Sequence, residues 1–321
     1  MAQWLLNRLL ESKDQSKPWF AFQGTVNWMR ALSILADNES FEDNKIKDHY
    51  KSVSRRKANP EADTLVFENV MMAFHNQASL VRLTEDVAHP YDVCRSAIIS
   101  WYYSTYFTCS AMIAAASGSK QETHAHTAKV WQSDIVDAGL VMSPFSPCLS
   151  SLVKNVVGAE ISTYCRTKEY DLNTCPENDD EAWGAVVSYL KGTWDYEKRR
   201  VEERVKSSRE FKVLKAADFR AKAARALRDE QLAKNVVNYL IQAFRYRGKA
   251  NYRDSIFLSY GYDNSEKMEI FVQDLEKVSR AFQRMAACYL SRRVEEGTWS
   301  KLIEDLEDNS RLSIEAQYLA V

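Results

Sequence analysis

The feature that most constrains this fold is a long stretch of chain with no proline or glycine. No proline occurs from 181 to 247, and no glycine lies between Gly192 and Gly248. β-proteins need these residues at regular turn positions, whereas helix interiors exclude them. The stretch is rich in Ala, Arg, Lys and Glu and has only a weak apolar stripe, which is typical of helices that protrude into solvent. We therefore expect one or two long helices here, folded as a hairpin.

The rest of the chain also favours helices. Only 9 glycines and 6 prolines occur among its 321 residues, and 45% of them are hydrophobic, enough for a sizeable core. Residues 91–116 carry the clearest pattern, because their apolar side chains recur at helical spacing. Similar spacing predicts helices over 2–13, around 28–35, and over 62–88, 122–138, 147–165, 265–293 and 298–308. The predicted fold class is all-α, a helical bundle with a long helical hairpin insertion.

Charge is unevenly distributed along the chain. From Lys198 to Arg253 there are 17 Lys or Arg residues against 6 Asp or Glu, while the whole chain has a formal net charge of −1. Such asymmetry can mark a surface that faces nucleic acid. The alternative is a solvated helix face, or one paired with the acidic helix near 298–308 of the same or a neighbouring chain. Both interpretations stay open at the level of sequence.

Several classes of protein lack sequence support. None of the six cysteines forms a C-x-x-C pair, and none has a histidine at zinc-ligand spacing, so we expect buried free thiols in a reducing cytosol. His124 and His126 are two apart and do not share a helix face, so surface or capping roles are expected for them. Phosphate-loop and nucleophile-elbow motifs are absent from the sequence. We expect no metal and no cofactor.

The same reasoning extends to the location of the protein. The apolar run near the first residue is too short and too charged for a signal peptide, and no stretch approaches about 18 uncharged apolar residues. The chain is therefore expected to be soluble and cytoplasmic, with no membrane contact.

One polar cluster is a candidate site. The segment FRYRGKANYRD, residues 244–254, holds four cations, two tyrosines and an asparagine. Guanidinium groups bind phosphates in bidentate fashion and tyrosine rings stack on bases, which would suit nucleic acid. Alternatively, the cluster marks a break between helices, where Arg253 and Asp254 lock a junction and Tyr246 and Tyr252 are half-buried packing residues.

Three segments resemble the HEPN superfamily of helical proteins. The aromatic helix CRSAIISWYYSTYFTCSAMIAAA is similar to the family's first helix, and THAHTAKVWQSDIVDAGL, in which a histidine precedes an apolar-striped run, is similar to its second. RGKANYRD resembles the region that opens a later helix in some members. The resemblance divides the chain into an N-terminal helical region (1–90), a HEPN-like bundle (91–165 and 240–293), a basic helical insertion (166–239) and an acidic C-terminal helix and tail (294–321).

The resemblance implies an activity. Many HEPN proteins are metal-independent ribonucleases of prokaryotic defence or toxin systems, and paired protomers form a site from an arginine followed four to six residues later by a histidine. Here Tyr252 stands where that histidine is expected after Arg247, and a tyrosine of ordinary pKa near 10 is a poor base at pH 7. Arg82 and His89 have the spacing but precede the family-like first helix, so we regard that match as chance.

Two hypotheses follow. In the first, the chain binds or cleaves RNA at a degenerate site, with Arg247 and Tyr252 in catalytic positions. Its phosphate-binding and base-binding residues would be Arg245, Lys249, Asn251 and Arg253, together with the hairpin cations Arg220, Lys222, Arg225 and Arg228. In the second, the chain is a non-catalytic helical scaffold that forms a homodimer or docks an acidic partner protein.

Overall fold

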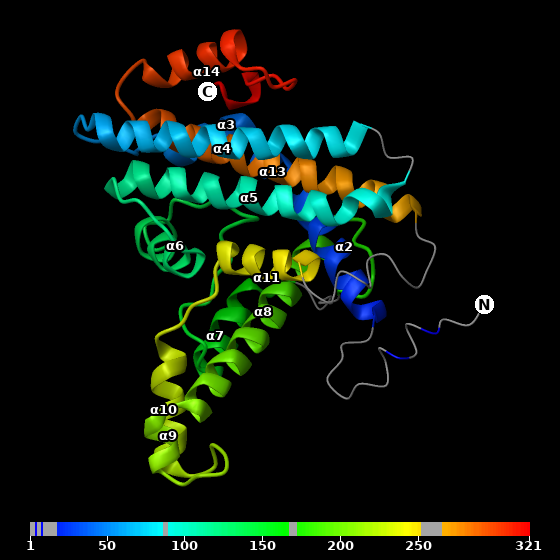
Figure 1. Ribbon diagram of the computed structural model, residues 1–321, viewed down its shortest axis with the longest axis vertical. Helices are drawn as coiled ribbons and strands as arrows, with labels where there is room; N and C mark the ends of the chain where they lie inside the picture. The colour runs from blue at the N-terminus through cyan, green and yellow to red at the C-terminus, as the bar shows by residue number, and fades with distance from the viewer. Residues whose placement is uncertain (1–3, 5–7, 9–17, 86–88, 167–171, 252–264) are drawn as a thin grey trace.

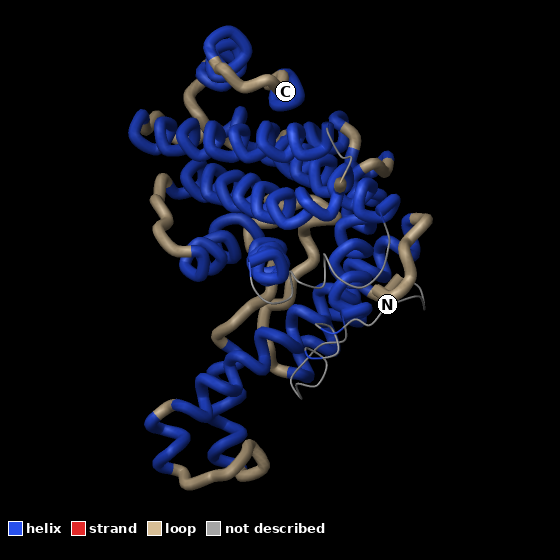
Figure 2. The backbone as a smooth tube through the Cα atoms, turned by 45° about the vertical axis from the view of Figure 1, so that its right-hand side comes forward, coloured by secondary structure: helices blue, strands red, loops and turns tan. Residues whose placement is uncertain are grey.

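The computed structural model describes residues 4, 8, 18–85, 89–166, 172–251 and 265–321 (Figure 1). Within these residues every regular element is a helix (Figure 2), so the predicted all-α fold class is confirmed. The expected helix over 2–13 falls almost entirely outside the described residues. No described helix is long and apolar enough to cross a membrane.

The described chain is divided among helices of very different length. In chain order they are α2 (Pro18–Ala36), η1 (Glu39–Phe41), α3 (Asp43–Tyr50), α4 (Pro60–Glu85), α5 (Pro90–Ser117), α6 (His124–Trp131), η2 (Gln132–Val136), α7 (Lys154–Tyr164), α8 (Asp179–Ser207), α9 (Arg209–Val213), α10 (Lys222–Ala233), α11 (Tyr239–Asn251), α13 (Ser265–Arg293), α14 (Thr298–Asn309) and η3 (Gln317–Leu319). The predicted helices over 62–88, 91–116, 265–293 and 298–308 correspond to α4, α5, α13 and α14.

Helix α5 forms the centre of the bundle. Its neighbours are α4, α13 and α11 (Figure 1), and its predicted apolar stripe, which includes Trp101 and Met112, is fully buried. Small side chains on its other faces are buried too, which lets the neighbouring helices approach closely. The helix ends at Gly118, whose φ of +73° suits glycine and whose N–H bonds the Ala114 carbonyl at 2.8 Å. A Cβ there would lie 3.3 Å from that of Ala62.

Helix α8 belongs to two cores. It begins with a capping interaction, in which the Asn178 side chain accepts a hydrogen bond from the Glu181 N–H at 3.0 Å. Its first half is buried in the bundle, where Tyr189 stacks on Trp28 of α2 with the ring centroids 4.0 Å apart. Its second half leaves the bundle and forms a hairpin with α9 and α10 (Figure 1). That hairpin has a small core of its own, which includes Val201, Val205, Phe211, Ala224, Leu232 and, from before α7, Leu149 and Leu152.

The predicted hairpin insertion is therefore present, but its packing does not follow the boundaries 166–239. The beginning of α8 packs in the main bundle, and residues 149–157 contribute to the hairpin core. Two backbone hydrogen bonds between Leu149 and Val237 connect the segment before α7 to the segment after α10. These long-range contacts leave no periodic signal in the sequence.

Two local expectations differ from the structure. Residues 43–50, for which the sequence predicted no helix, form α3, which buries Ile46 and Tyr50. A break between helices was predicted at 244–254. Instead, α11 continues through Gly248 as far as Asn251, the last described residue of this segment. Tyr246 is fully buried rather than half-buried, and its hydroxyl donates a hydrogen bond to the Thr25 carbonyl at 2.6 Å. Burying this side chain stabilises the helix across the glycine.

The cysteines also differ in part from expectation. All six are free thiols. Three are buried as predicted, namely Cys94, Cys109 and Cys288, whereas Cys148 and Cys175 are partly exposed and Cys165 is exposed. Burial raises the pKa of the Cys94 thiol to about 11, so it stays protonated at neutral pH.

A polar network ties the segment after α14 to the bundle. The Tyr318 hydroxyl donates to the Gln283 side-chain oxygen, while the Gln283 amide donates to the Ser104 hydroxyl, which lies 2.7 Å from that of Ser279. We expect Tyr318→Phe to lower the free energy of unfolding by about 1–3 kcal/mol, because the buried Gln283 oxygen loses its partner. Urea denaturation measures this. Tyr196→Phe, at a 44% exposed tyrosine, is the control and should change stability by less than about 0.5 kcal/mol. Equal effects of the two substitutions would contradict the network's role.

Candidate functional site

Arg247 lies in an aromatic cluster between α11 and α5. Its guanidinium carbon is 5.0 Å from the ring centroid of Tyr102, 5.8 Å from that of Tyr103 and 5.3 Å from that of Phe244. One terminal nitrogen, Nη1, donates to the Tyr103 hydroxyl at 3.3 Å. Neither Nε, which is buried, nor Nη2 has a hydrogen bond to a described residue. Aromatic faces favour the cation here, and part of its donor capacity remains unused.

His124 completes this cluster from the first position of α6. The helix begins at the Thr123 cap, whose side-chain oxygen accepts from the His126 N–H at 3.3 Å. The Nδ1 atom of His124 is 2.8 Å from the Tyr102 hydroxyl, and its ring centroid is 4.6 Å from that of Tyr106. Two tyrosines of α5 therefore fix the position of the imidazole.

The surroundings of His124 favour its neutral form. Partial burial lowers the pKa of His124 from its usual 6.5, and the positive charge of Arg247 lowers this pKa further. Both effects have the same physical sense, since each disfavours the imidazolium cation. At neutral pH the ring is uncharged. In the tautomer whose Nδ1–H donates to Tyr102, its Nε2 atom can accept a proton.

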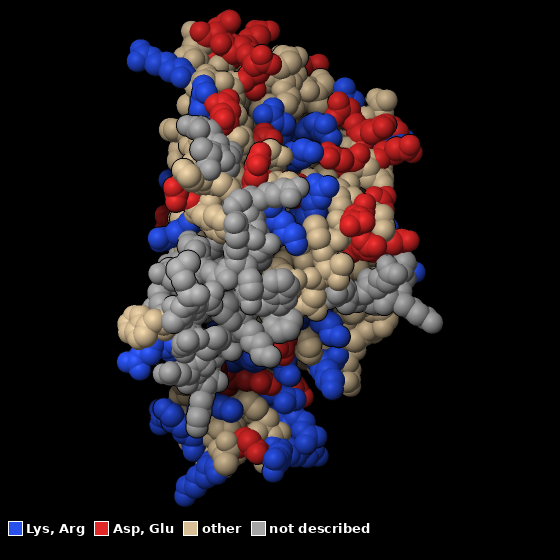
Figure 3. All heavy atoms as spheres, turned by 90° about the vertical axis from the view of Figure 1, so that its right-hand side faces the viewer, with Lys and Arg blue, Asp and Glu red and all other residues tan. Residues whose placement is uncertain are grey.

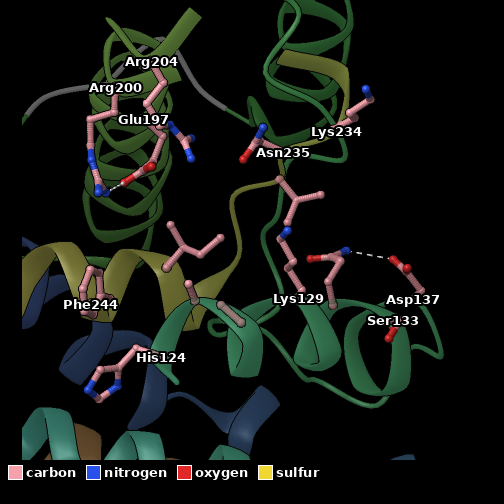
Figure 4. A pocket seen from close by; sticks show the side chains of 15 residues that line it. His124, Lys129, Ser133, Asp137, Glu197, Arg200, Arg204, Lys234, Asn235 and Phe244 are labelled. Atoms are coloured by element: carbon pink, nitrogen blue, oxygen red, sulfur yellow. Dashed lines mark hydrogen bonds and ion pairs between the residues drawn. The ribbon is translucent and has the colours of Figure 1, made fainter. Parts of the chain in front are cut away.

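A cavity of about 490 Å³ adjoins the cluster (Figure 4). His124 and Phe244 form one edge, and the His124 ring is directed away from Lys129, toward α5. The other walls come from α6, η2, α8 and the segment before α11. The charged side chains that line it are Lys129, Asp137, Glu197, Arg200, Arg204 and Lys234.

Not all of these charges are available to a ligand. Arg200 pairs with Glu197 at 3.0 Å, and Lys234 pairs with Glu230 at 2.6 Å. Lys129 and Arg204 form no ion pair with any described residue, and both are exposed. The cavity thus offers two free cations within one hollow, which suits an anionic ligand.

The structure separates the residues that the sequence grouped around 244–254. Arg245 points to α8 rather than to the cavity: its Nη1 donates to the Thr193 hydroxyl at 2.9 Å, and its guanidinium lies 5.2 Å from the ring centroids of Tyr189 and Tyr196. Arg245 is therefore a packing residue between two helices. Lys249 and Asn251 lie in the last turn of α11, and the structure describes their backbone only. Tyr252 and Arg253 lie outside the described residues.

The four hairpin cations are not equivalent. Arg220 has a 94% exposed side chain beside Asp218, and Lys222 and Arg225 are exposed. Arg228 instead is half-buried. It pairs with Asp229 at 2.7 Å and with Glu202 at 3.8 Å, and stacks over Phe219. The predicted nucleic-acid surface thus loses Arg228 to contacts within the hairpin.

Arg82 and His89, which have the arginine-to-histidine spacing of the family motif, are not brought together as a catalytic pair. Arg82 donates to the Ser313 hydroxyl at 2.8 Å and pairs with Glu85, while His89 precedes the first residue of α5. The histidine that does lie near an arginine is His124, which the sequence analysis assigned to a surface or capping role. Its electrostatic interaction with Arg247 joins positions far apart in the chain, so spacing within a motif does not reveal it. The one sequence feature that could have identified His124 as a site residue is its position at the start of the family-like second helix.

The cluster can bind an anion and accept a proton at adjacent positions. Arg247 supplies a guanidinium with unused donors, and neutral His124 supplies a base whose orientation Tyr102 fixes. The described residues include no group of three or more His, Cys, Asp and Glu side chains arranged to hold a metal ion. Comparison with protein-family models, with curated proteins and with solved structures found no match to this chain.

Proposed function

We propose that this chain binds single-stranded RNA and cleaves it without a metal ion, at the site formed by His124 and Arg247. The observation that carries the proposal is the position of His124, whose Nδ1 lies 2.8 Å from the Tyr102 hydroxyl at the edge of a cavity with two free cations. Burial and the Arg247 charge lower its pKa and so favour its neutral form. Partly exposed aromatic rings, such as Tyr103 and Phe107, offer stacking surfaces for bases.

The proposed chemistry uses the ribose 2′-hydroxyl. His124 accepts the proton of the 2′-hydroxyl through Nε2, and the 2′-oxygen attacks the adjacent phosphorus. The bond from phosphorus to the 5′-oxygen breaks, and the leaving oxygen takes a proton from water. The products are a 2′,3′-cyclic phosphate and a 5′-hydroxyl. Arg247 stabilises the charge that develops on the phosphate oxygens, and His124 returns its proton to solvent.

The family resemblance supports the same site. It implies an arginine followed four to six residues later by a histidine as base, and its first two family-like segments are residues 94–116 and 123–140. Arg247 packs against the first of these, α5, and His124 opens the second, α6. In this proposal His124 replaces the histidine that is absent at Tyr252. Membership in a defence or toxin system is part of the same proposal, and it rests on the resemblance alone.

The test is cleavage of a labelled single-stranded RNA in excess EDTA. We expect slow cutting that leaves a cyclic phosphate end. A matched strand with one ribose in an otherwise DNA backbone should be cut only after that ribose, and the all-DNA strand should stay intact, because it lacks the nucleophile. Cutting of the all-DNA strand, or loss of cutting in EDTA, would contradict the proposed chemistry.

Binding is tested separately from cleavage. We expect Lys129→Glu combined with Arg204→Glu to weaken RNA binding at least about tenfold. The slope of log affinity against log salt should fall by roughly 1.4, since two phosphate contacts to a single strand are lost. Fluorescence anisotropy at several salt concentrations measures both quantities. Lys301→Glu is the control, because it removes an exposed cation from α14, far from the cavity. If the control and the double variant bind equally, the cavity does not hold the strand.

A further inference from the structure

The two ends of the molecule carry opposite charge. The hairpin of α8, α9 and α10 and the helix α14 lie at opposite ends of the long axis (Figure 1). Seen from the side, acidic side chains gather over α14 and basic side chains over the hairpin (Figure 3). The sequence left open whether the basic hairpin pairs with α14 of the same chain or of a neighbour. The separation excludes pairing within one chain.

The end of the hairpin, which we call the basic tip, is poor in internal counter-charges. It consists of the exposed cations Arg209, Lys212, Lys215, Arg220, Lys222 and Arg225. Within the described residues, the only ion pair at the tip joins Arg220 to Asp218 at 3.3 Å, and Glu210 is exposed in the same segment. Two large apolar side chains lie among these cations, Val213 with 72% of its surface exposed and Leu214 with 40%. Apolar side chains in a charged surface are more typical of a protein contact than of a phosphate-binding surface.

Helix α14 carries the complementary surface. Its inner side buries Trp299, Ile303 and Leu306. The outer side, which we call the acidic face, consists of Glu304, Asp305, Glu307 and Asp308, all exposed and without an ion pair to any described residue. The last of these lie in the final turn, where the helix dipole is negative and disfavours carboxylates. A cationic partner would relieve this repulsion.

We propose that the basic tip of one copy docks on the acidic face of a second copy. The tip supplies cations in excess, the face supplies four unpaired carboxylates, and Val213 and Leu214 give the contact an apolar centre. The contact joins two different surfaces, so it is head-to-tail and extends to chains or closed rings. Exposed ion pairs each contribute little, so the association is weak and sensitive to salt. This inference does not depend on the ribonuclease proposal.

Sedimentation velocity tests the proposal on the full chain. We expect self-association at about 100 µM protein in about 50 mM salt, and monomers in about 500 mM salt, as screening predicts. Two charge-reversed proteins are then compared. The tip variant carries Lys212→Glu, Lys215→Glu and Lys222→Glu, and the face variant carries Glu304→Lys, Glu307→Lys and Asp308→Lys. Each alone is expected to be monomeric at low salt, because like charges then meet.

Mixing the two variants gives the decisive result. The reversed tip of one should bind the reversed face of the other, and the unchanged tip of the face variant should bind the unchanged face of the tip variant. The mixture should therefore regain head-to-tail assembly, with the two variants alternating. A chain with all six changes should assemble as the wild type does. The control variant, Lys45→Glu, Lys57→Glu and Lys120→Glu, reverses three exposed lysines elsewhere and should still associate. Circular dichroism confirms that each variant is folded.

Several outcomes would overturn the inference. The inference is wrong if the wild-type chain stays monomeric at low salt and high protein concentration. Association that survives either reversal, or a mixture that forms no complex, rejects the proposed pair of surfaces. If the tip variant associates normally but binds RNA more weakly than wild type, the tip contacts nucleic acid instead, as the sequence analysis considered.

Discussion

Replacing Trp101 with alanine is expected to lower the free energy of unfolding by about 3–5 kcal/mol, as for other large buried aromatic side chains. Trp101 is fully buried at the centre of α5. Its ring lies edge-on to Trp28 at 5.9 Å and to Tyr246 at 5.2 Å, so it joins α5 to α2 and α11. Alanine would leave a cavity between three helices that the remaining rings cannot fill without moving their backbones.

Urea denaturation followed by circular dichroism measures this loss. The midpoint should fall while the slope stays near that of the wild type, which would show that stability and not the denatured state has changed. Trp4→Ala is the matched control, because 69% of the Trp4 side chain is exposed. It should change stability by less than about 0.5 kcal/mol. A Trp101 variant as stable as that control would mean that α5 is not the centre of the core.

The position of Trp101 could be predicted because its signal is local. The residues on its helix face recur every three or four positions, and all of them are buried. The same reasoning missed α3, because only Ile46 and Tyr50 are buried in its eight residues, too few to establish a period. It also placed a break at Gly248, where packing of Tyr246 and Ala250 keeps α11 continuous. Tertiary contacts here outweigh the low helix propensity of glycine.

The candidate site was predicted only in part. Arg247 was named from the density of cations around it, and the structure places it in an aromatic cluster with unused donors. His124 was not named as a site residue, because the role proposed for it depends on Tyr102 of α5 and Arg247 of α11. Both are far from it in the sequence. Arg245, two residues before Arg247, was predicted to bind phosphate only because it belongs to the same cation-rich segment. The helical turn directs it to α8, so neighbouring arginines have different roles.

His124→Gln is expected to reduce the proposed RNA cleavage by roughly 100-fold or more, since general acid–base groups contribute about 10²–10⁴. Glutamine keeps a polar side chain near Tyr102 but cannot take up a proton. Binding measured by anisotropy should change little, because Lys129 and Arg204 still hold the strand. Single-turnover rates at saturating enzyme separate the two effects. A variant that cuts at the wild-type rate would exclude His124 as the base.

The pH dependence tests the same assignment through a second observable. Burial and the Arg247 charge lower the pKa of His124 below 6.5, so the active neutral form persists through pH 7. The cleavage rate should therefore be level at neutral pH and fall as pH decreases through this lowered pKa. Arg247→Ala removes one of the two causes, so the pKa of His124 should rise and the acid limb should move to higher pH. The rate itself should fall by about 10²–10³ as well, because charge stabilisation at the phosphate is lost.

NMR titration of the His124 ring protons measures that pKa without any substrate, and this distinguishes the electrostatic coupling from a loss of folding. In wild type the titration midpoint should lie below 6.5, and in Arg247→Ala it should lie higher. His126, which is exposed and two residues away, reports within the same spectra whether the helix start is intact. Because Arg247 lowers the pKa through its charge, Arg247→Lys should retain most of the shift while losing the planar donor pair. A His124 midpoint at or above 6.5, unchanged by either substitution, would mean that the two side chains are neighbours without being coupled.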